Sequence, residues 1–564
     1  MITKKRIGDV LISLNLLTEE QLEKCLQLQA VNHMKLGEVL IAEGHLRREQ
    51  LNAALEFQLG VPFLDLGMTD IDPRVPKLIS EQLARKHNVI PIKLENNLLT
   101  LVMADPFDIV ARDDVRIVTG FQTEVIMSSQ DDVQRAINTF YDSSEVVQKT
   151  IEEIKHTEFL DEKDTLLKQQ EQASEEEVAK APVVRLVNTI MLQGIKIKAS
   201  DIHIEAFEKA SVVRCRVDGE LREVMKLPKT SHAAIVTRIK ILAGMDIAET
   251  RKPQDGRIES TVEGMNIDMR ISILPTVHGE KVVIRILRGS SILVTKEQLG
   301  FSAHNIKRFE QIIKAPEGII LLTGPTGSGK TTTLYTVLRE LNKPSVNIIT
   351  VEDPVEYKLE GVNQVQVNAK AGLTFAAGLR SILRQDPDIV MVGEIRDPET
   401  AEIAVRAAIT GHVVLSTIHT NDAVSTVSRL VDMGSEPFLV SSALMGVIAQ
   451  RLVRKICPRC KEQRLQTIEE ALMLGLDKPV MLSYGKGCQN CNHTGYSGRQ
   501  GIHEILVMDR ELRNMIVKGA STDEIKERAR QKGMKTLADS ARDLVLEGKT
   551  TIDEMIRVSY SVDE

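Results

Sequence analysis

The clearest chemical signal in the sequence is a glycine-rich segment that follows the apolar run of residues 318–323. The segment has the pattern G-x-x-x-x-G-K-[ST] and leads into a run of helix-forming residues. Its glycines let successive backbone N–H groups face one anion, and the start of the helix adds its positive end. The lysine supplies a cation for the β and γ phosphates, and the hydroxyl supplies a ligand for Mg²⁺. We predict that ATP and Mg²⁺ are bound by Gly324, Pro325, Thr326, Gly327, Ser328, Gly329, Lys330, Thr331 and Thr332.

Polar side chains end three apolar segments downstream of the glycine-rich segment. Glu394 closes the run DIVMVGE, Glu352 closes NIITVE, and His419 lies in the polar stretch STIHTND. A carboxylate at a strand end beside a phosphate site can polarise an attacking water or hold magnesium through water. A histidine there can donate to the γ-phosphate, although a lone histidine is more often structural. Glu394 could also be a solvated residue that caps the next helix.

Four cysteines form two C-x-x-C pairs, separated by 27 residues. Four thiolates suit tetrahedral Zn²⁺ in a closed structural site, and each pair can form its own knuckle, so the loop between them can be long. A redox role would need a thioredoxin-like pattern beside one pair, which the sequence lacks. We therefore predict zinc binding over four free thiols, with the ligands Cys457, Cys460, Cys488 and Cys491.

A tandem repeat opens the chain. Residues 6–29 and 35–58 align without gaps, and each copy holds a short helix, a turn and a second helix. Thr18 and Gln21 in the first copy fit a capping box at the start of its second helix. A small helical bundle used only for docking would give the same pattern.

The positioning elements divide the chain into an α/β multidomain architecture. We expect the tandem repeat at 1–60, an α/β unit at 61–142, a charged linker at 143–180 and a second α/β domain at 181–290. The linker prediction rests on the absence of Gly and Pro and an excess of acidic residues. Alternating strands and helices after residue 290 predict a parallel sheet covered by helices. This last domain would extend to residue 564 and include the cysteine pairs at 457–491 and a helical end.

Composition narrows the class of partner. The net charge is −7 and aromatic residues make up 3% of the 564 residues, so neither a global basic field nor an aromatic platform for nucleic acid is indicated. No apolar run approaches the roughly 18 residues needed to span a bilayer. We expect a cytoplasmic protein that reaches a membrane only through partners.

Four motifs together resemble the secretion ATPase superfamily. They are GPTGSGKTTT, ITVEDPVE, ILRQDPDIVMVGEIRD and TGHVVLSTIHTND. The repeat, the segment ASDIHIE and the cysteine insert point within it to the PilB/GspE family, the ATPases of type IV pilus assembly (extension) and of type II secretion. The resemblance implies a ring hexamer, a PAS-like domain before a RecA-like ATPase domain, and an inner-membrane platform protein and cytoplasmic assembly proteins as partners. It also implies that ATP binding closes the PAS-like domain onto the RecA-like domain and that ATP is then hydrolysed.

The same resemblance assigns roles to single residues. It makes Glu394 the Walker B glutamate, Glu352 the aspartate-box glutamate and His419 the histidine-box sensor, with Lys330 on the phosphates. Either glutamate could orient the water, and we favour Glu394 for its Walker B position alone. The arginines that stand where the family's arginines reach the phosphates are Arg257, Arg270 and Arg285. Any one of them could instead form only a surface ion pair.

The tandem repeat itself resembles the MshEN domain, a receptor for cyclic di-GMP. A doubled motif can present like groups to the two halves of a two-fold ligand. Asn15, Cys25 and Lys35 depart from the pattern, and lysine lacks the bidentate fork of arginine. The predicted ligand-contacting residues are Arg6, Ile7, Gly8, Leu11, Leu22, Leu26, Gln29, Lys35, Leu36, Gly37, Leu40, Leu51, Leu55 and Gln58.

Four functions compete at this point. Pilus assembly and type II secretion use the same chemistry, and the sequence barely separates them. A motor that acts directly on nucleic acid is disfavoured by the acidic charge and the scarcity of aromatics. A non-catalytic adaptor that only binds nucleotide is disfavoured because all four motifs are present.

Overall fold

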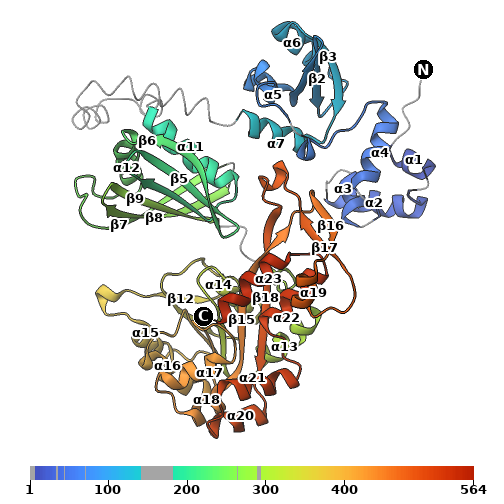
Figure 1. The fold of residues 1–564 in the computed structure, drawn as a ribbon. Coiled ribbons are helices and arrows are strands. Elements are labelled where there is room, and N and C mark those ends of the chain that lie inside the picture. Colours follow the sequence, from blue (N-terminus) through green and yellow to red (C-terminus); the bar gives the residue numbers. More distant parts are fainter. Residues whose placement is uncertain are drawn as a thin grey trace. The chain divides into compact units, whose positions relative to one another are not determined.

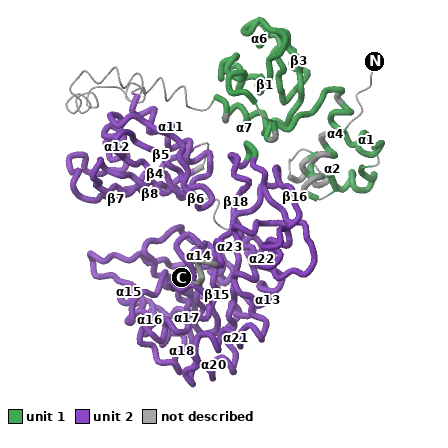
Figure 2. Tube along the Cα trace, in the orientation of Figure 1, with its two compact units in different colours: residues 1–153, 488–490 green, residues 154–487, 491–564 purple. Residues whose placement is uncertain are grey.

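The chain folds into two compact units, which are described separately. The computed structural model describes residues 7–14, 16–32, 36–43, 45–46, 48–69, 71–141, 182–262, 265–288 and 294–563. Unit 1 comprises residues 1–153 and 488–490, and unit 2 comprises residues 154–487 and 491–564 (Figure 2). The predicted linker at 143–180 lies outside the described residues, as do Arg6, Asn15 and Lys35. No helix within the described ranges combines the length and apolar character needed to cross a bilayer.

The tandem repeat in unit 1 is a bundle of short helices, as expected. Helix α1 packs against α4 and α2 against α3, so the two copies interlock rather than stand side by side. The backbone N–H of Thr18 donates to the side chain of Gln21 and that of Gln21 to the hydroxyl of Thr18, which confirms the capping box. The helices are α1 (Ile7–Ser13), α2 (Glu19–Asn32), α3 (Leu36–Ala42) and α4 (Arg48–Leu59).

The rest of unit 1 is a small three-stranded α/β domain. Its sheet has the order β1-β2-β3, with β1 and β2 antiparallel and β2 and β3 parallel. The strand expected over VPFLDL is wrong: only Phe63 forms an isolated bridge, and the Asp65 side chain accepts from Gly67 to start a 3-10 helix. The elements are α5 (Glu81–His87), β1 (Val89–Glu95), β2 (Leu98–Met103), α6 (Ile109–Thr119), β3 (Gln122–Met127) and α7 (Gln130–Phe140).

Unit 2 begins with a six-stranded antiparallel sheet that carries two helices (Figure 1). The strand order is β6-β5-β4-β9-β8-β7. The helix predicted over residues 181–199 is present as α11, and the strand predicted at SDIHIEAF is β4. The elements are α11 (Pro182–Lys196), β4 (Asp201–Ala206), β5 (Ala210–Val217), β6 (Glu220–Pro228), α12 (Ser231–Leu242), β7 (Gln254–Val262), β8 (Met265–Thr276) and β9 (Gly279–Arg288).

A seven-stranded sheet forms the centre of the remaining domain. Its order is β12-β11-β13-β14-β10-β15-β18, and every pairing is parallel except that of β15 with β18. Strand β10 is buried along its whole length, as the apolar run predicts for a central parallel strand. The strands are β10 (Gly318–Thr323), β11 (Ile348–Glu352), β12 (Asn363–Gln366), β13 (Ile389–Val392), β14 (Val413–Ile418), β15 (Leu444–Ile456) and β18 (Tyr496–Val507).

Helices cover both faces of this sheet, and the chain ends in a helical group. Two buried clusters, one on each face, follow from the parallel topology. A two-stranded ribbon of β16 (Lys461–Leu465) and β17 (Met481–Gly485) projects between β15 and β18. The helices are α13 (Ala303–Ile313), α14 (Lys330–Leu341), α15 (Phe375–Ile382), α16 (Pro398–Ile409), α17 (Ser425–Asp432), α18 (Pro437–Ala443), α19 (Ile468–Leu474), α20 (Arg510–Val517), α21 (Thr522–Gln531), α22 (Leu537–Leu546) and α23 (Ile552–Asp563).

Candidate nucleotide site

The glycine-rich segment joins β10 to α14 as a phosphate loop. Gly324 and Gly329 adopt φ angles of 145° and 89°, and Gly329 is the residue that directly precedes α14. A Cβ atom at Gly324 would lie 2.4 Å from the carbonyl oxygen of Gln450, so only glycine fits there. The Nζ of Lys330 donates to the carbonyls of Gly324 at 2.7 Å and Pro325 at 3.1 Å. The ammonium therefore lies against the loop whose N–H groups would face a polyphosphate.

Gln450, a residue that the sequence did not single out, holds this loop from β15. Its side-chain N–H donates to the carbonyl of Ser328 at 2.9 Å, and its side-chain oxygen accepts from the hydroxyl of Thr333 at 2.7 Å. One buried amide thus fixes the loop to the first turn of α14. The only sequence signal was a polar residue inside an apolar run, which is weak on its own.

Arg451, also missed, lies beside the loop on the same strand. Its side chain is 6% exposed, and its Nη2 donates to the carbonyl of Asn421 at 2.9 Å. Its Nε is buried without a hydrogen-bond partner. Burial and the charge of Arg451 lower the pKa of Lys330 to about 8, while Glu394 acts in the opposite direction. The loop is therefore cationic beyond its own lysine.

Glu394 follows β13 on the other side of β10 and is held by bonds to β14. The hydroxyl of Ser416 donates to the carbonyl of Val392 at 2.7 Å, and that of Thr417 donates to the carbonyl of Gly393 at 2.8 Å. The N–H of Ile395 donates to the carbonyl of Thr417 at 2.9 Å. These bonds bracket Glu394, so the backbone that carries its carboxylate is fixed.

His419 and Arg396 lie on the same carboxylate oxygen of Glu394. The Nε of Arg396 is 2.6 Å from Oε2, and the Nε2 of His419 is 3.7 Å from it. Burial first, and then the positive charges of Lys330 and Arg396, lower the pKa of His419 below its ordinary value. The imidazole is 46% exposed, and its lowered pKa favours the neutral form, which can donate from one ring nitrogen to a phosphate.

Glu352 has a different environment from Glu394. Its side chain is 3% exposed, and Oε1 accepts from the hydroxyl of Thr350 at 2.6 Å and from Gln364 at 3.1 Å. The phenol of Tyr335 on α14 donates to Oε2. Both oxygens are thus used inside the protein. This geometry favours Glu394 for water activation and gives Glu352 the position of a support for α14.

The three predicted arginines occupy one row of the six-stranded sheet. Arg257 on β7 is the cross-strand partner of Arg270 on β8, and Arg270 is that of Arg285 on β9. Directly paired residues share a face of the sheet, and like charges placed so are unfavourable without anions between them. Acidic residues partly neutralise the row, because Arg257 pairs with Asp268 at 2.6 Å and Arg285 with Asp201 at 3.1 Å.

Of the three, Arg270 reaches the segment after β11, within the motif ITVEDPVE. Its Nη1 is 3.1 Å from Oε2 of Glu356, and its Nη2 donates to the carbonyl of Val355 at 3.2 Å. The structure does not bring Arg257 or Arg285 to the phosphate loop. In this structure, Arg257 and Arg285 therefore form only ion pairs, the alternative given for them above.

The four predicted cysteines converge at the base of the β16–β17 ribbon. All four are buried, and their Sγ atoms lie within 4.8 Å of one another. Cys460 Sγ and Cys491 Sγ are 3.8 Å apart. Zn–S bonds of about 2.3 Å in a tetrahedron require sulfurs about 3.8 Å apart, so the spacing fits. The N–H groups of Gly487 and Gly495 each donate to a sulfur at 3.3 Å, which stabilises thiolates.

The predicted cyclic di-GMP residues fall into two groups among those described. Leu11 and Leu40 are fully buried in the core of the bundle. A Cβ on Gly8 would lie 2.8 Å from Leu22, and one on Gly37 would lie 2.6 Å from Leu51, so helix packing by itself requires both glycines. The exposed or partly exposed members are Ile7, Leu22, Leu26, Gln29, Leu36, Gly37, Leu51, Leu55 and Gln58.

Comparison with known proteins gives the family. The sequence matches the family described as Type II/IV secretion system protein over residues 176–557, and the MshEN domain over residues 59–147. It is 42% identical over 566 residues to the type IV pilus assembly ATPase PilB of Myxococcus xanthus, covering 98% of both chains. It is 41% identical over 564 residues to the type II secretion system protein E of Xanthomonas campestris pv. campestris, again covering 98% of both.

The solved structures add a fold comparison. The ATPase DotB of Legionella pneumophila has a TM-score of 0.50 at 22% identity, with 66% of this chain and 95% of that chain covered. This likeness shows the fold alone, which is mixed α/β as expected. The MshEN match lies on the small α/β domain beside the tandem repeat, so the ligand contacts within residues 1–60 stay a prediction. With the family matched over two thirds of its length, this chain belongs to the type II/IV secretion system protein family and is an ATPase.

Proposed function

We propose that this protein is a cytoplasmic hexameric ATPase that powers type IV pilus assembly. The observation that carries the proposal is the convergence of Lys330, Glu394 and His419 around one phosphate loop. The full-length similarity to a pilus assembly ATPase supports the pilus function. Type II secretion is the alternative, because a secretion protein E is similar over the same share of the chain.

The residues around the loop have distinct roles in hydrolysis. Backbone N–H groups of residues 326–331 would bind the phosphates, Lys330 would neutralise them, and the hydroxyl of Thr331 would hold Mg²⁺. Mg²⁺ supplies charge neutralisation between the phosphates when it is bound. Glu394 accepts the proton of the attacking water, because it is the acid whose carboxylate remains partly open. His419 donates to the terminal phosphate and registers its loss.

Domain closure delivers the second set of charges. Arg270 already contacts the segment after β11, whereas Arg257 and Arg285 pair with acids of their own sheet. A phosphate drawn to this row would replace those carboxylates as the anion between the arginines. Hydrolysis removes that anion, so the closed arrangement loses its differential contacts and the domains separate. In a ring hexamer this motion would move an inner-membrane platform protein.

Two further ligands complete the proposal. Zinc held by Cys457, Cys460, Cys488 and Cys491 would fix the base of the β16–β17 ribbon, as the buried thiols and their spacing suggest. Cyclic di-GMP would bind the tandem repeat and regulate the motor, with cytoplasmic assembly proteins docking to the same region. No direct contact with nucleic acid is proposed, because the net charge of −7 gives no basic field.

Three experiments test the proposal. The Lys330→Ala variant should lose ATP turnover while keeping its fold, and normal turnover would contradict the assigned site.

Deletion of the gene should abolish surface pili and leave secreted enzymes at normal levels. Loss of secreted enzymes with pili intact would instead establish the secretion function. Calorimetry with cyclic di-GMP on the whole protein should show binding, and no heat at high micromolar ligand would exclude that ligand.

A further inference from the structure

The C-terminal helix α23 contributes a cation to the phosphate-loop cavity. This cavity has a volume of about 250 Å³ and is lined by residues 325–328 of the loop. Arg557 of α23 lines it together with Arg451 and Arg499, and the turn of residues 218–219 from the six-stranded sheet closes one side. Three arginines from three elements thus line one cavity with the loop. None of them belongs to the four motifs that identify the family.

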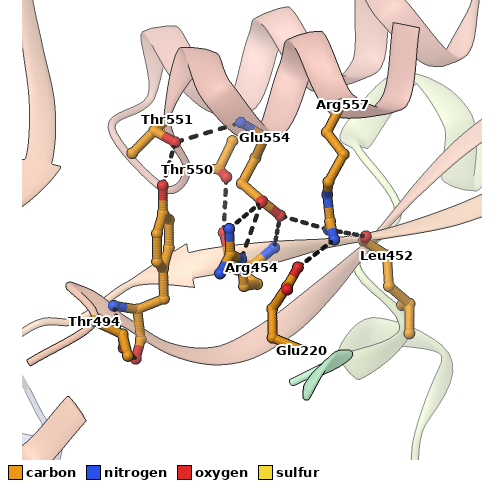
Figure 3. A network of polar contacts seen from close by, with 9 residues as sticks. Glu220, Leu452, Arg454, Thr494, Thr550, Thr551, Glu554 and Arg557 are labelled. Atoms are coloured by element: carbon orange, nitrogen blue, oxygen red, sulfur yellow. Dashed lines mark hydrogen bonds and ion pairs between the residues drawn. The ribbon is translucent and has the colours of Figure 1, made fainter. Parts of the chain in front are cut away.

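Arg557 is oriented by a buried carboxylate (Figure 3). Glu554, one turn earlier on α23, is 1% exposed and lies 2.7 Å from Nη2 of Arg557. The same carboxylate accepts from the backbone N–H of Arg454 at 2.7 Å and from its Nε at 2.9 Å. A buried carboxylate with two arginines is costly to break, because removing a partner leaves a charge without compensation. Arg557 is therefore held at the cavity from one side.

The other side of the Arg557 guanidinium binds the preceding domain. Its Nη1 lies 3.3 Å from Oε1 of Glu220, the first residue of β6. The same hairpin places Asp218 against β18, where its carboxylate accepts from the N–H of Gly498 at 2.9 Å and lies 3.7 Å from Arg499. Both acids of one hairpin tip therefore meet arginines that line the cavity.

The Arg557–Glu220 ion pair is weak enough for another anion to replace Glu220. Both side chains are more than 40% exposed, and ion pairs of that kind contribute about 0.2–1 kcal/mol. A polyphosphate carries several negative charges and matches the guanidinium fork, so it is the stronger partner at the same position. Glu554 keeps the arginine in place during the exchange.

We propose that Arg557 is a nucleotide-binding residue, for which Glu220 and the phosphates of the bound nucleotide compete. Nucleotide in the phosphate loop attracts Arg557, which frees the 218–220 hairpin and lets the preceding domain move. Conversely, the docked hairpin lowers nucleotide affinity, because linkage between two ligands of one group is reciprocal. This inference rests on the phosphate loop being the nucleotide site, as proposed above.

Removal of the competitor gives the first test. Glu220→Gln in the full chain should bind Mg²⁺-ADP up to about fivefold more tightly, the equivalent of the 0.2–1 kcal/mol of an exposed pair. Glu223→Gln, an exposed acid of the same strand that is not the partner of Arg557, is the matched control and should leave the affinity unchanged. Arg557→Gln should weaken binding, and adding Glu220→Gln to it should then have no effect. That loss of additivity is specific to competition for one guanidinium.

Hydrogen exchange gives a second, structural readout. The amide of Gly498 is bonded to Asp218, so Mg²⁺-ADP should speed its exchange in the wild type. If the wild type binds no Mg²⁺-ADP, both the proposed site and this inference are overturned. If the wild type binds but Glu220→Gln has wild-type affinity, or adds to Arg557→Gln, only the role of Arg557 is overturned.

Discussion

Nucleotide affinity should depend on pH through the protonation of Lys330. The pKa of this lysine is lowered to about 8, first by burial and then by Arg451. A bound polyphosphate favours the charged ammonium and raises that pKa again. Since binding needs the protonated lysine, the affinity for nucleotide is highest well below pH 8 and falls as the pH rises through that value. Above it, each binding event takes up a proton from solvent.

The size of the effect follows from the protonated fraction. With a pKa of about 8, roughly 0.76 of the lysine is protonated at pH 7.5 and roughly 0.09 at pH 9.0. The affinity should therefore fall about eightfold over this interval, or about 1.3 kcal/mol. An unperturbed lysine with a pKa of about 10.4 would give almost no change over the same range.

A titration of Mg²⁺-ADP against the purified protein at four pH values from 7.5 to 9.0 measures this slope. Lys330→Met should bind weakly with no slope. Lys343→Met, which removes an exposed lysine of the same domain, should keep the wild-type slope. A wild-type affinity that stays constant over the range, or a slope that survives in Lys330→Met, would refute the assignment.

Three further predictions concern the other sites. Glu394→Gln should keep Mg²⁺-ATP binding but hydrolyse ATP at least about 100-fold more slowly in single turnover, because the acceptor for the water proton is lost; an unchanged rate would move that role elsewhere. Cys460→Ser should lose zinc by metal analysis while Cys215→Ser retains it, and equal zinc in both would exclude the cysteine site. Gly37→Ala should destabilise the tandem repeat by about 1–3 kcal/mol in denaturant unfolding, because its Cβ meets Leu51 at 2.6 Å. Leu51→Ala should recover part of that loss, and independent effects of the two changes would contradict the contact.

The parts of the site that the sequence predicted are those made by contiguous residues. The glycine spacing before Lys330 dictates a local backbone path, and Glu394 follows an apolar strand of the expected length. The cysteine pairs were equally readable, because two short knuckles need no knowledge of the chain between them. Each of these signals lies in one or two short contiguous segments.

The parts that were missed depend on pairing between distant strands. Gln450 and Arg451 meet the phosphate loop only because β15 pairs with β10, more than 120 residues earlier in the chain. The row of Arg257, Arg270 and Arg285 depends on the register of three antiparallel strands, and a shift of one residue would turn one of them to the other face. The strand predicted at residues 61–66 is absent although the segment is apolar, because the Asp65 side chain accepts from the N–H of Gly67 and starts a 3-10 helix.

Strand order separates two activities of the phosphate loop. Strands β13 and β14 lie on one side of β10 and carry Glu394 and His419, the groups suited to cleavage. Strands β15 and β18 lie on the other side and bring Arg451 and Arg499, with Arg557 packed beside them. The first side changes when the terminal phosphate leaves, whereas the second responds to any nucleotide in the loop. A motor needs both signals, because occupancy must free the preceding domain to close before cleavage lets it separate again, and a single loop flanked in this way provides them in sequence.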